Sequence, residues 1–386
     1  MSVIHFNNAG AGLMPEPVVD AMTSYLRAEA ELGGYETAAA HRSEIEDFYA
    51  AAAQLLGCAP RNIAFATSAT DAYARALSAI PFERGDVIVT TRNDYISNQI
   101  AFLSMRKRLG VDVVHAPDVE EGGVDVDAMA RLMRERRPRL VAVTHVPTNS
   151  GLVQPVAAVG AHCRELDVLY LVDACQSAGQ LPLDVDQLGC DFLSATSRKF
   201  LRGPRGGGLL YVSDRALAAG YEPLFLDMRG ARWTGFEEYE PVETARRFED
   251  WEFSYATVVG AATAIRYALA VGLDAIAERA TVLGASLRES LGAVDGVRLL
   301  DRGRELCAIV TIDVPDADKL HDDLERRGIN SSVSELQHAR YDFADKGVDA
   351  ALRLSPHYYN TAAEIDEVVA AIAELTARDA RALHVT

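Results

Sequence analysis

Two side chains in this sequence could together support chemistry on an amino group. Lys199 follows the short hydroxyl-rich run Thr196–Ser197, and Asp173, 26 positions upstream of the lysine, ends an apolar run. A loop amine and a strand-end carboxylate are the two protein groups that pyridoxal phosphate (PLP) requires, because the amine condenses with the aldehyde and the carboxylate keeps the pyridine nitrogen protonated. The pair therefore predicts carbanion chemistry on an amino acid, with Lys199 as the catalytic residue.

The neighbours of this pair could hold an anionic cofactor. The stretch Ala66-Thr-Ser-Ala-Thr-Asp-Ala72 follows a predicted strand and opens a predicted helix, so its N–H groups and hydroxyls should converge on an anion. An ordinary helix cap remains an alternative for these hydroxyls. Arg198 and Arg202 flank Lys199 and should lower the pKa of its amine, which favours the free base.

Composition limits the partners of the protein. The chain has 386 residues, is 49% hydrophobic and carries a formal net charge of −18, so nucleic acid and anionic membranes are disfavoured as partners. No signal peptide or membrane span is expected, and we predict a cytoplasmic protein without a metal site. Five cysteines without a Cys-x-x-Cys pair indicate free thiols. Cys175 is interpreted as a packing residue rather than a nucleophile.

Short apolar runs alternate with helical patterns, which predicts an α/β fold with a mostly parallel sheet. Ligands of such sheets bind at the carboxyl ends of the strands, where Asp173 and Thr196 are expected. We predict a large PLP-binding domain over 16–265 and a small α/β domain formed by 1–15 and 266–386. The Arg-, Glu- and Trp-rich segment Leu226–Glu252 is expected to form an excursion over the site or a subunit contact. The predicted strands of the large domain are Asn62–Thr67, Val87–Thr91, Val111–His115, Leu140–His145, Leu169–Asp173, Phe192–Ala195 and Gly208–Val212.

The run Asp191-Phe-Leu-Ser-Ala-Thr-Ser-Arg-Lys-Phe-Leu-Arg-Gly-Pro-Arg-Gly-Gly207 and the run Leu352-Arg-Leu-Ser-Pro-His-Tyr-Tyr-Asn-Thr361 resemble the class V aminotransferase family. The resemblance covers nearly the whole chain and implies the PLP-dependent transferase fold of the aspartate aminotransferase type (fold type I), in a homodimer with active sites near the subunit interface. It also implies that Arg353 clamps the substrate carboxylate, with Asn8 and Tyr35 as further substrate contacts. The cofactor-binding residues that it implies are Ala69, Thr70, Tyr95, Thr148, Asp173, Gln176, Thr196, Arg198 and Lys199.

Three departures from the family pattern bear on the reaction. Tyr95 stands where cysteine desulfurases carry a stacking histidine, and the stretch Gly328–Arg340 lacks their loop cysteine. Trp251 and Glu252 replace the Gly-Thr with which relatives bind phosphate across the dimer. The segments Glu29–Thr37 and Thr196–Arg205 look similar to C–S lyases of the ergothioneine pathway, which implies β-elimination from an S-substituted cysteine or its sulfoxide. Transamination, epimerisation and decarboxylation stay open, a PLP-fold binding protein without catalysis is less favoured, and His145 is as compatible with a structural role as with a functional one.

Overall fold

The computed structural model describes residues 3–383, and its largest sheet has seven strands in the order β2-β8-β7-β6-β5-β3-β4. Strands β3 to β7 pair in parallel, whereas β8 runs antiparallel to both β2 and β7. The predicted mostly parallel sheet is therefore confirmed, and the predicted strands match the observed ones to within one residue at each end. The strands are β2 (Ile63–Ala66), β3 (Val87–Thr90), β4 (Asp112–His115), β5 (Leu140–Thr144), β6 (Leu169–Asp173), β7 (Phe192–Thr196) and β8 (Gly208–Val212).

Helices bury both faces of this sheet, as the unbroken apolar runs require. Alternate residues of one strand face opposite cores: Val141 and Val143 of β5 join one hydrophobic cluster, and Leu140 and Ala142 join the other. The first cluster is covered by α3 (Arg42–Leu56), α6 (Val126–Arg136), α7 (Val156–Glu165), α8 (Val185–Leu188) and α10 (Tyr255–Val271). The second is covered by α4 (Ala69–Ala79), α5 (Ile96–Leu109), α9 (Asp214–Ala218) and the 3-10 turn η2 (Ala245–Phe248).

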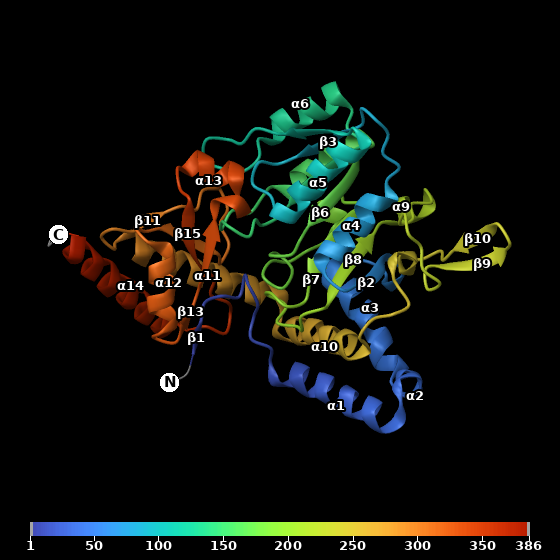
Figure 1. Ribbon diagram of the computed structural model, residues 1–386, viewed down its shortest axis with the longest axis horizontal. Helices are drawn as coiled ribbons and strands as arrows, with labels where there is room; N and C mark the ends of the chain where they lie inside the picture. The colour runs from blue at the N-terminus through green and yellow to red at the C-terminus, as the bar shows by residue number, and fades with distance from the viewer. Residues whose placement is uncertain (1–2, 384–386) are drawn as a thin grey trace.

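A smaller antiparallel sheet lies beside the large one and has its own core (Figure 1). Its order is β11 (Arg298–Leu299), β12 (Val310–Asp313), β15 (Ala350–Leu354) and β14 (Ser332–Glu335). The N-terminal strand β1 (Ile4–His5) pairs with β13 (Ile329–Asn330), and Ile4 and Phe6 are buried in the same core. We retain 1–15 with 266–386 as the proposed small domain. Its helices are α11 (Leu273–Gly292), α12 (Ala317–Glu325) and α14 (Ala362–Leu383).

The segment Leu226–Glu252 forms an arm whose strands the sequence did not indicate. Strands β9 (Ala231–Gly235) and β10 (Glu238–Pro241) make an antiparallel hairpin that projects from the body (Figure 1). Both faces of this hairpin are largely exposed, so its sequence lacks the alternation of apolar and polar residues that marks a half-buried strand.

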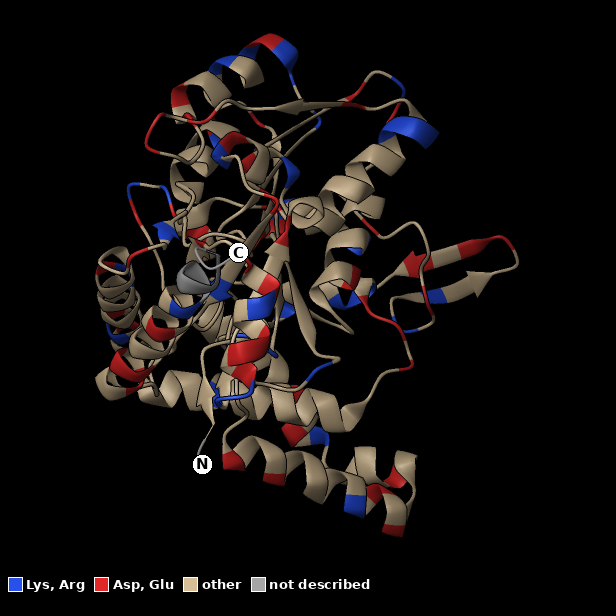
Figure 2. Cartoon of the chain, turned by 60° about the vertical axis from the view of Figure 1, so that its left-hand side comes forward, with Lys and Arg blue, Asp and Glu red and all other residues tan. Residues whose placement is uncertain are grey.

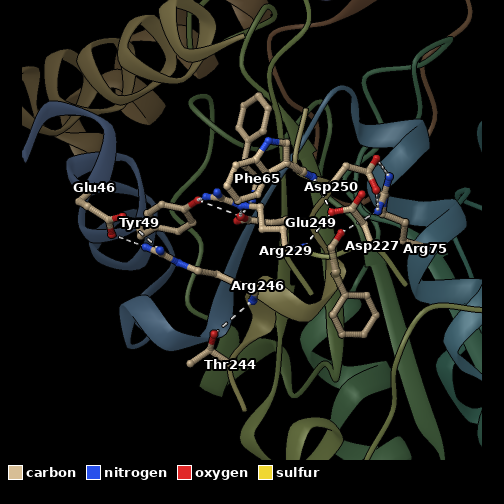
Figure 3. Close-up of polar contacts among 12 residues, drawn as sticks. Glu46, Tyr49, Phe65, Arg75, Asp227, Arg229, Thr244, Arg246, Glu249 and Asp250 are labelled. Atoms are coloured by element: carbon tan, nitrogen blue, oxygen red, sulfur yellow. Dashed lines mark hydrogen bonds and ion pairs between the residues drawn. The ribbon is translucent and has the colours of Figure 1, made fainter. Parts of the chain in front are cut away.

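Buried polar contacts anchor the base of the arm to the body (Figure 3). The Glu249 carboxylate is paired with Arg229 at 2.5 Å and accepts hydrogen bonds from the Tyr49 hydroxyl and the Phe65 N–H. The Arg246 guanidinium lies 3.9 Å from the centre of the Tyr49 ring. The base of the arm is thus a fixed part of the molecule.

The remaining elements are short or peripheral: α1 (Glu16–Leu32), α2 (Gly34–Ala40), η1 (Pro60–Asn62), η3 (Leu336–His338) and α13 (Arg340–Lys346). Charged residues gather on helices and loops, while the strands of the central sheet are almost free of them (Figure 2). Within residues 3–383 no single helix has the length and apolar character to cross a bilayer; α10 and α11 would pass only as a pair, and they are bent by 80°.

Candidate active site

All nine residues predicted to bind the cofactor line one pocket at the carboxyl ends of the central strands. They come from the turns and strand ends after β2, β3, β5, β6 and β7, which lie at the same edge of the sheet. The pocket is lined by Ser68, Ala69, Thr70, Tyr95, Thr144, Val146, Thr148, Asp173, Cys175, Gln176, Thr196, Arg198 and Lys199.

Lys199 lies in the turn after β7 and is 6% exposed. Its Nζ is 5.9 Å from the centre of the Tyr95 ring, so the amine and a flat aromatic face lie on the same cavity. Burial lowers the pKa of the Lys199 amine, and the nearby cations Arg198 and Arg353 act in the same direction, against Cys175 and Asp173. The lowered pKa shifts the equilibrium toward the neutral amine, the form that can act as a nucleophile or a base.

Asp173 ends β6 and is 4% exposed. Its Oδ1 accepts a hydrogen bond from the Cys175 N–H at 2.9 Å, and its Oδ2 accepts one from the Asn98 amide at 3.1 Å. Asp173 forms no ion pair with any residue in the described range 3–383. A buried carboxylate without a cation is costly, and a protonated pyridine nitrogen would supply the missing charge.

The N-terminus of α4 forms a cradle for an anion. Ser68 caps the helix by accepting a hydrogen bond from the Asp71 N–H, and the first backbone N–H groups of the helix, at Ala69 and Thr70, adjoin the pocket. The start of β8 packs directly against this turn: a Cβ at Gly208 would lie 2.5 Å from the Ser68 carbonyl carbon. Glycine at 208 therefore lets the cradle sit against the sheet.

Arg353 is a buried cation beside the pocket. Its guanidinium donates to the Thr148 carbonyl and hydroxyl at 2.9 and 2.8 Å and to the Asn7 side chain at 3.1 Å. It has no carboxylate partner among the described residues, and its Nε is buried without a hydrogen bond. Burial lowers the pKa of Arg353 to about 10, and the neighbouring Arg198 contributes. Two neighbouring cations, Arg353 and Arg198, with no carboxylate partner among the described residues make a candidate site for a carboxylate.

Gln176 keeps unused hydrogen-bonding capacity in the pocket. Its amide nitrogen donates to the Ala9 carbonyl and to the Thr148 hydroxyl, at 3.1 and 2.9 Å, but its Oε1 is buried without a partner. These features fit one ligand. The N-terminus of α4 suits a phosphate, the unpaired carboxylate of Asp173 suits a protonated ring nitrogen, and the unpartnered polar atoms of Gln176 and Arg353 suit an adduct that carries a carboxylate.

The sequence did not indicate the roles of three side chains, of which Thr144 lines the pocket and Asp94 and Asn98 do not. Asp94, Asn98 and Thr144 form a buried hydrogen-bonded cluster with Asp173. The available signal was the pair of polar residues Asp94, in the turn before α5, and Asn98, in its first turn, at the point where a strand leads into a helix.

Three other predicted positions lie outside the pocket. Asn8 is fully buried: its amide nitrogen donates to the His5 and Ser355 carbonyls, and its oxygen accepts from Tyr359. Tyr35, 74% exposed, lines a separate cavity with Trp251 and Glu252. Burial lowers the pKa of His145 to about 4, so this ring is neutral, and it does not line the pocket. Substrate contact by Asn8 and Tyr35 stays a prediction.

Known proteins resemble this chain over nearly its whole length. The family described as aminotransferase class V matches residues 4–368. A "probable hercynylcysteine sulfoxide lyase" of Mycobacterium tuberculosis is 30% identical over 97% of this chain and 90% of its own length. A "probable cysteine desulfurase" of Methanothermobacter thermautotrophicus is 26% identical over 94% of this chain and 92% of its own length.

Solved structures of other proteins share the fold of this chain over nearly its whole length. The apo cysteine desulfurase of Thermococcus onnurineus NA1 superposes with a TM-score of 0.88 at 25% identity, covering 97% of this chain and 94% of the other. The cystine C–S lyase C-DES, at 23% identity and a TM-score of 0.86, shares the fold over 96% of this chain and 97% of its own. Another C-DES structure holds glycine covalently linked to its PLP. The chain therefore belongs to the class V aminotransferase family and is a PLP-dependent enzyme of the fold type I architecture.

Proposed function

We propose that this enzyme cleaves a C–S bond by β-elimination from an S-substituted cysteine or its sulfoxide. With water, an S-substituted cysteine gives the free thiol, pyruvate and ammonia; a sulfoxide gives the corresponding sulfenic acid instead of the thiol. The reaction needs no oxidant, reductant or keto acid. It needs a base for the α-proton, a clamp for the carboxylate and a group that accepts electrons from the α-carbon.

The chain supplies the first two of these groups. The Arg353 guanidinium, held by Thr148 and Asn7, would bind the substrate carboxylate by paired hydrogen bonds. That contact orients the α-carbon toward Lys199, whose buried amine would take the α-proton. PLP supplies the electron sink when it is bound. Tyr95 would stack on the ring, Ala69 and Thr70 would hold the phosphate, and Asp173 would meet the pyridine nitrogen.

The observation that carries this proposal is the position of the five cysteines. Cys58, Cys163, Cys190 and Cys307 do not line the pocket, and the segment from β13 to α13 contains serines but no cysteine. Cys175 does line it, but burial raises the pKa of its thiol well above the usual value, and the charge of Asp173 adds to this. Sulfur transfer to an enzyme requires a thiolate, which is disfavoured here. Sulfur should therefore leave with its own substituent.

The relatives support a sulfur-containing substrate and leave the reaction open. Their names include a sulfoxide lyase, a cystine C–S lyase and several cysteine desulfurases. A desulfurase would hold the sulfur as a persulfide, so the missing loop cysteine favours the lyases. We further propose a cytoplasmic homodimer, with Tyr35, Trp251 and Glu252 near a neighbouring subunit's site. Amino transfer, epimerisation and decarboxylation are the alternatives that the assay below separates.

The test is a product balance on the PLP-loaded enzyme. S-methylcysteine, its sulfoxide and cysteine are supplied in turn, and pyruvate, ammonia, free thiol, alanine and protein-bound persulfide are measured. We expect pyruvate, ammonia and methanethiol in equal amounts from S-methylcysteine, without any keto acid. Alanine with protein-bound persulfide would identify a desulfurase. Three other results would overturn the proposal. Amino transfer that requires a keto acid would identify an aminotransferase, racemised substrate would identify an epimerase, and released carbon dioxide would identify a decarboxylase.

A further inference from the structure

We infer that Asp94 is a positioning residue for the cofactor site: through the amide of Asn98 it fixes the Asp173 carboxylate in the orientation that meets the pyridine nitrogen. The inference rests on the proposed role of Asp173 and is independent of the reaction that the enzyme catalyses. Asp94 lies in the turn between β3 and α5, is 5% exposed and does not line the cofactor pocket.

Asn98 bridges the two carboxylates. Its Nδ2 is 3.0 Å from Asp94 Oδ1 and 3.1 Å from Asp173 Oδ2, so each amide hydrogen can point at one carboxylate. A longer contact of 3.3 Å joins the same nitrogen to the Thr144 hydroxyl. Asn98 is 3% exposed, so its amide is shielded from bulk solvent. The orientation of its amide is therefore set by the two acceptors that it serves.

Donors from several elements converge on Asp94. Its Oδ1 accepts from the Tyr95 N–H at 2.7 Å and from the Thr144 hydroxyl, and its Oδ2 accepts from the Gln99 amide at 2.6 Å. The oxygen of that Gln99 amide lies 2.8 Å from His115 Nε2. No described lysine, arginine or histidine forms an ion pair with Asp94. The carboxylate is thus satisfied by neutral donors and is held rigidly.

A second buried carboxylate so close to Asp173 is unfavourable for stability alone. Burial raises the pKa of Asp94, and the nearby charge of Asp173 adds to this, whereas the hydrogen bonds from Thr144, Gln99 and Asn98 oppose it. Without Asp94, the Asn98 amide would lose one of its acceptors and could turn away from Asp173. Asp173 would then keep only its contacts with Cys175, at one end of the carboxylate, and could rotate about its side-chain bonds. Its alignment with a ring nitrogen would be lost.

The test reads the ring nitrogen directly. The enzyme is loaded with PLP labelled with ¹⁵N in the ring, and the ¹⁵N resonance and PLP affinity are compared for Asp94→Ala, Asn98→Ala and Asp94→Asn. We expect both alanine variants to move the resonance toward that of an unprotonated pyridine and to weaken PLP binding by about 10-fold, as loss of a supporting contact does in metal sites. Asp94→Asn should lie closer to the unchanged enzyme, because its oxygen still accepts from Tyr95, Thr144 and Asn98.

Two further variants distinguish an error in the proposed cofactor site from an error in the proposed role of Asp94. Asp191→Ala removes another buried carboxylate of the same sheet, one paired with Arg215 and remote from the pocket, and should leave the resonance unchanged. Asp173→Asn should move it most. If Asp173→Asn leaves the resonance in place, the proposed cofactor site is wrong. If Asp173→Asn moves it while folded Asn98→Ala and Asp94→Ala do not, or if Asp191→Ala moves it equally, the role of Asp94 is wrong.

Discussion

Asp173 and Glu249 are both buried carboxylates, but only Glu249 has a cationic partner within residues 3–383. Glu249, at the base of the arm, is paired with Arg229 and accepts from Tyr49 and Phe65, so its charge is matched within the chain (Figure 3). Asp173 receives only neutral donors, although it is equally inaccessible. A matched buried charge stabilises a fold only weakly but is costly to break. An unmatched one that also lines a pocket, as Asp173 does and Asp94 does not, is a candidate binding site for a missing cation. The comparison separates structural from functional carboxylates.

The largest effect should come from Lys199, which lines the same pocket as Asp173. Lys199→Ala removes the base and the covalent attachment point, and turnover should fall by about 10²- to 10⁴-fold or more. Borohydride reduction of the native enzyme followed by peptide mapping should place the cofactor on Lys199. Lys346, another buried lysine but paired with Asp342 at 2.7 Å, is the matched control. Lys346→Met should lower stability yet retain the yellow cofactor; labelling of a different lysine would refute the assignment.

Replacing each carboxylate by the matching amide, as Glu249→Gln and Asp173→Asn, tests whether the two residues differ. Glu249→Gln leaves the partly buried Arg229 without its charged partner and should lower the free energy of unfolding by up to about 3–5 kcal/mol. Asp173→Asn, measured on the cofactor-free protein, should leave that free energy unchanged or raise it, because an unmatched charge is removed, while PLP binding weakens. Denaturant unfolding of both variants gives the two values. Equal destabilisation by both changes would contradict the contrast between a paired Glu249 and an unpaired Asp173.

Arg353→Gln should weaken the binding of substrate far more than the binding of PLP. It removes the cation from a carboxylate site without touching the α4 cradle, and losing such a charged hydrogen-bonding partner costs about 2–5 kcal/mol. Titrations of an amino-acid inhibitor and of PLP measure the two affinities separately. A fall in PLP affinity with unchanged inhibitor affinity would place the clamp elsewhere.

The tip of the arm should respond least. Phe236 is fully exposed at the turn of the hairpin, so Phe236→Ser should change the free energy of unfolding of the isolated chain by no more than about 0.5 kcal/mol. A loss comparable to that of Glu249→Gln, measured in the same denaturant series, would show that the tip is buried against another surface in solution.

The sequence predicted those parts of the site that follow from strand ends. Asp173 and Thr196 end short apolar runs and Lys199 follows the second of them. Parallel strands bring their carboxyl ends to one edge, so pattern alone places these residues together. The bridge from Asp94 through Asn98 was not predictable in this way, because it depends on side-chain rotamers across two strands and a helix. Tyr35 does not line the pocket of its own chain, and its contact with substrate stays a prediction, because sequence order carries no information on where α2 lies relative to a second subunit.

The central claim is that sulfur leaves with its substituent and never binds to the protein. The most direct measurement is pyruvate release from an S-alkyl cysteine by a variant in which all five cysteines are replaced by alanine or serine. We expect this variant, folded and loaded with PLP, to keep turnover within a few fold of the native enzyme, since none of the thiols is proposed to react. Complete loss of turnover in the folded, PLP-loaded variant, traced to a single thiol such as Cys175, would contradict thiol-free elimination and require a persulfide mechanism.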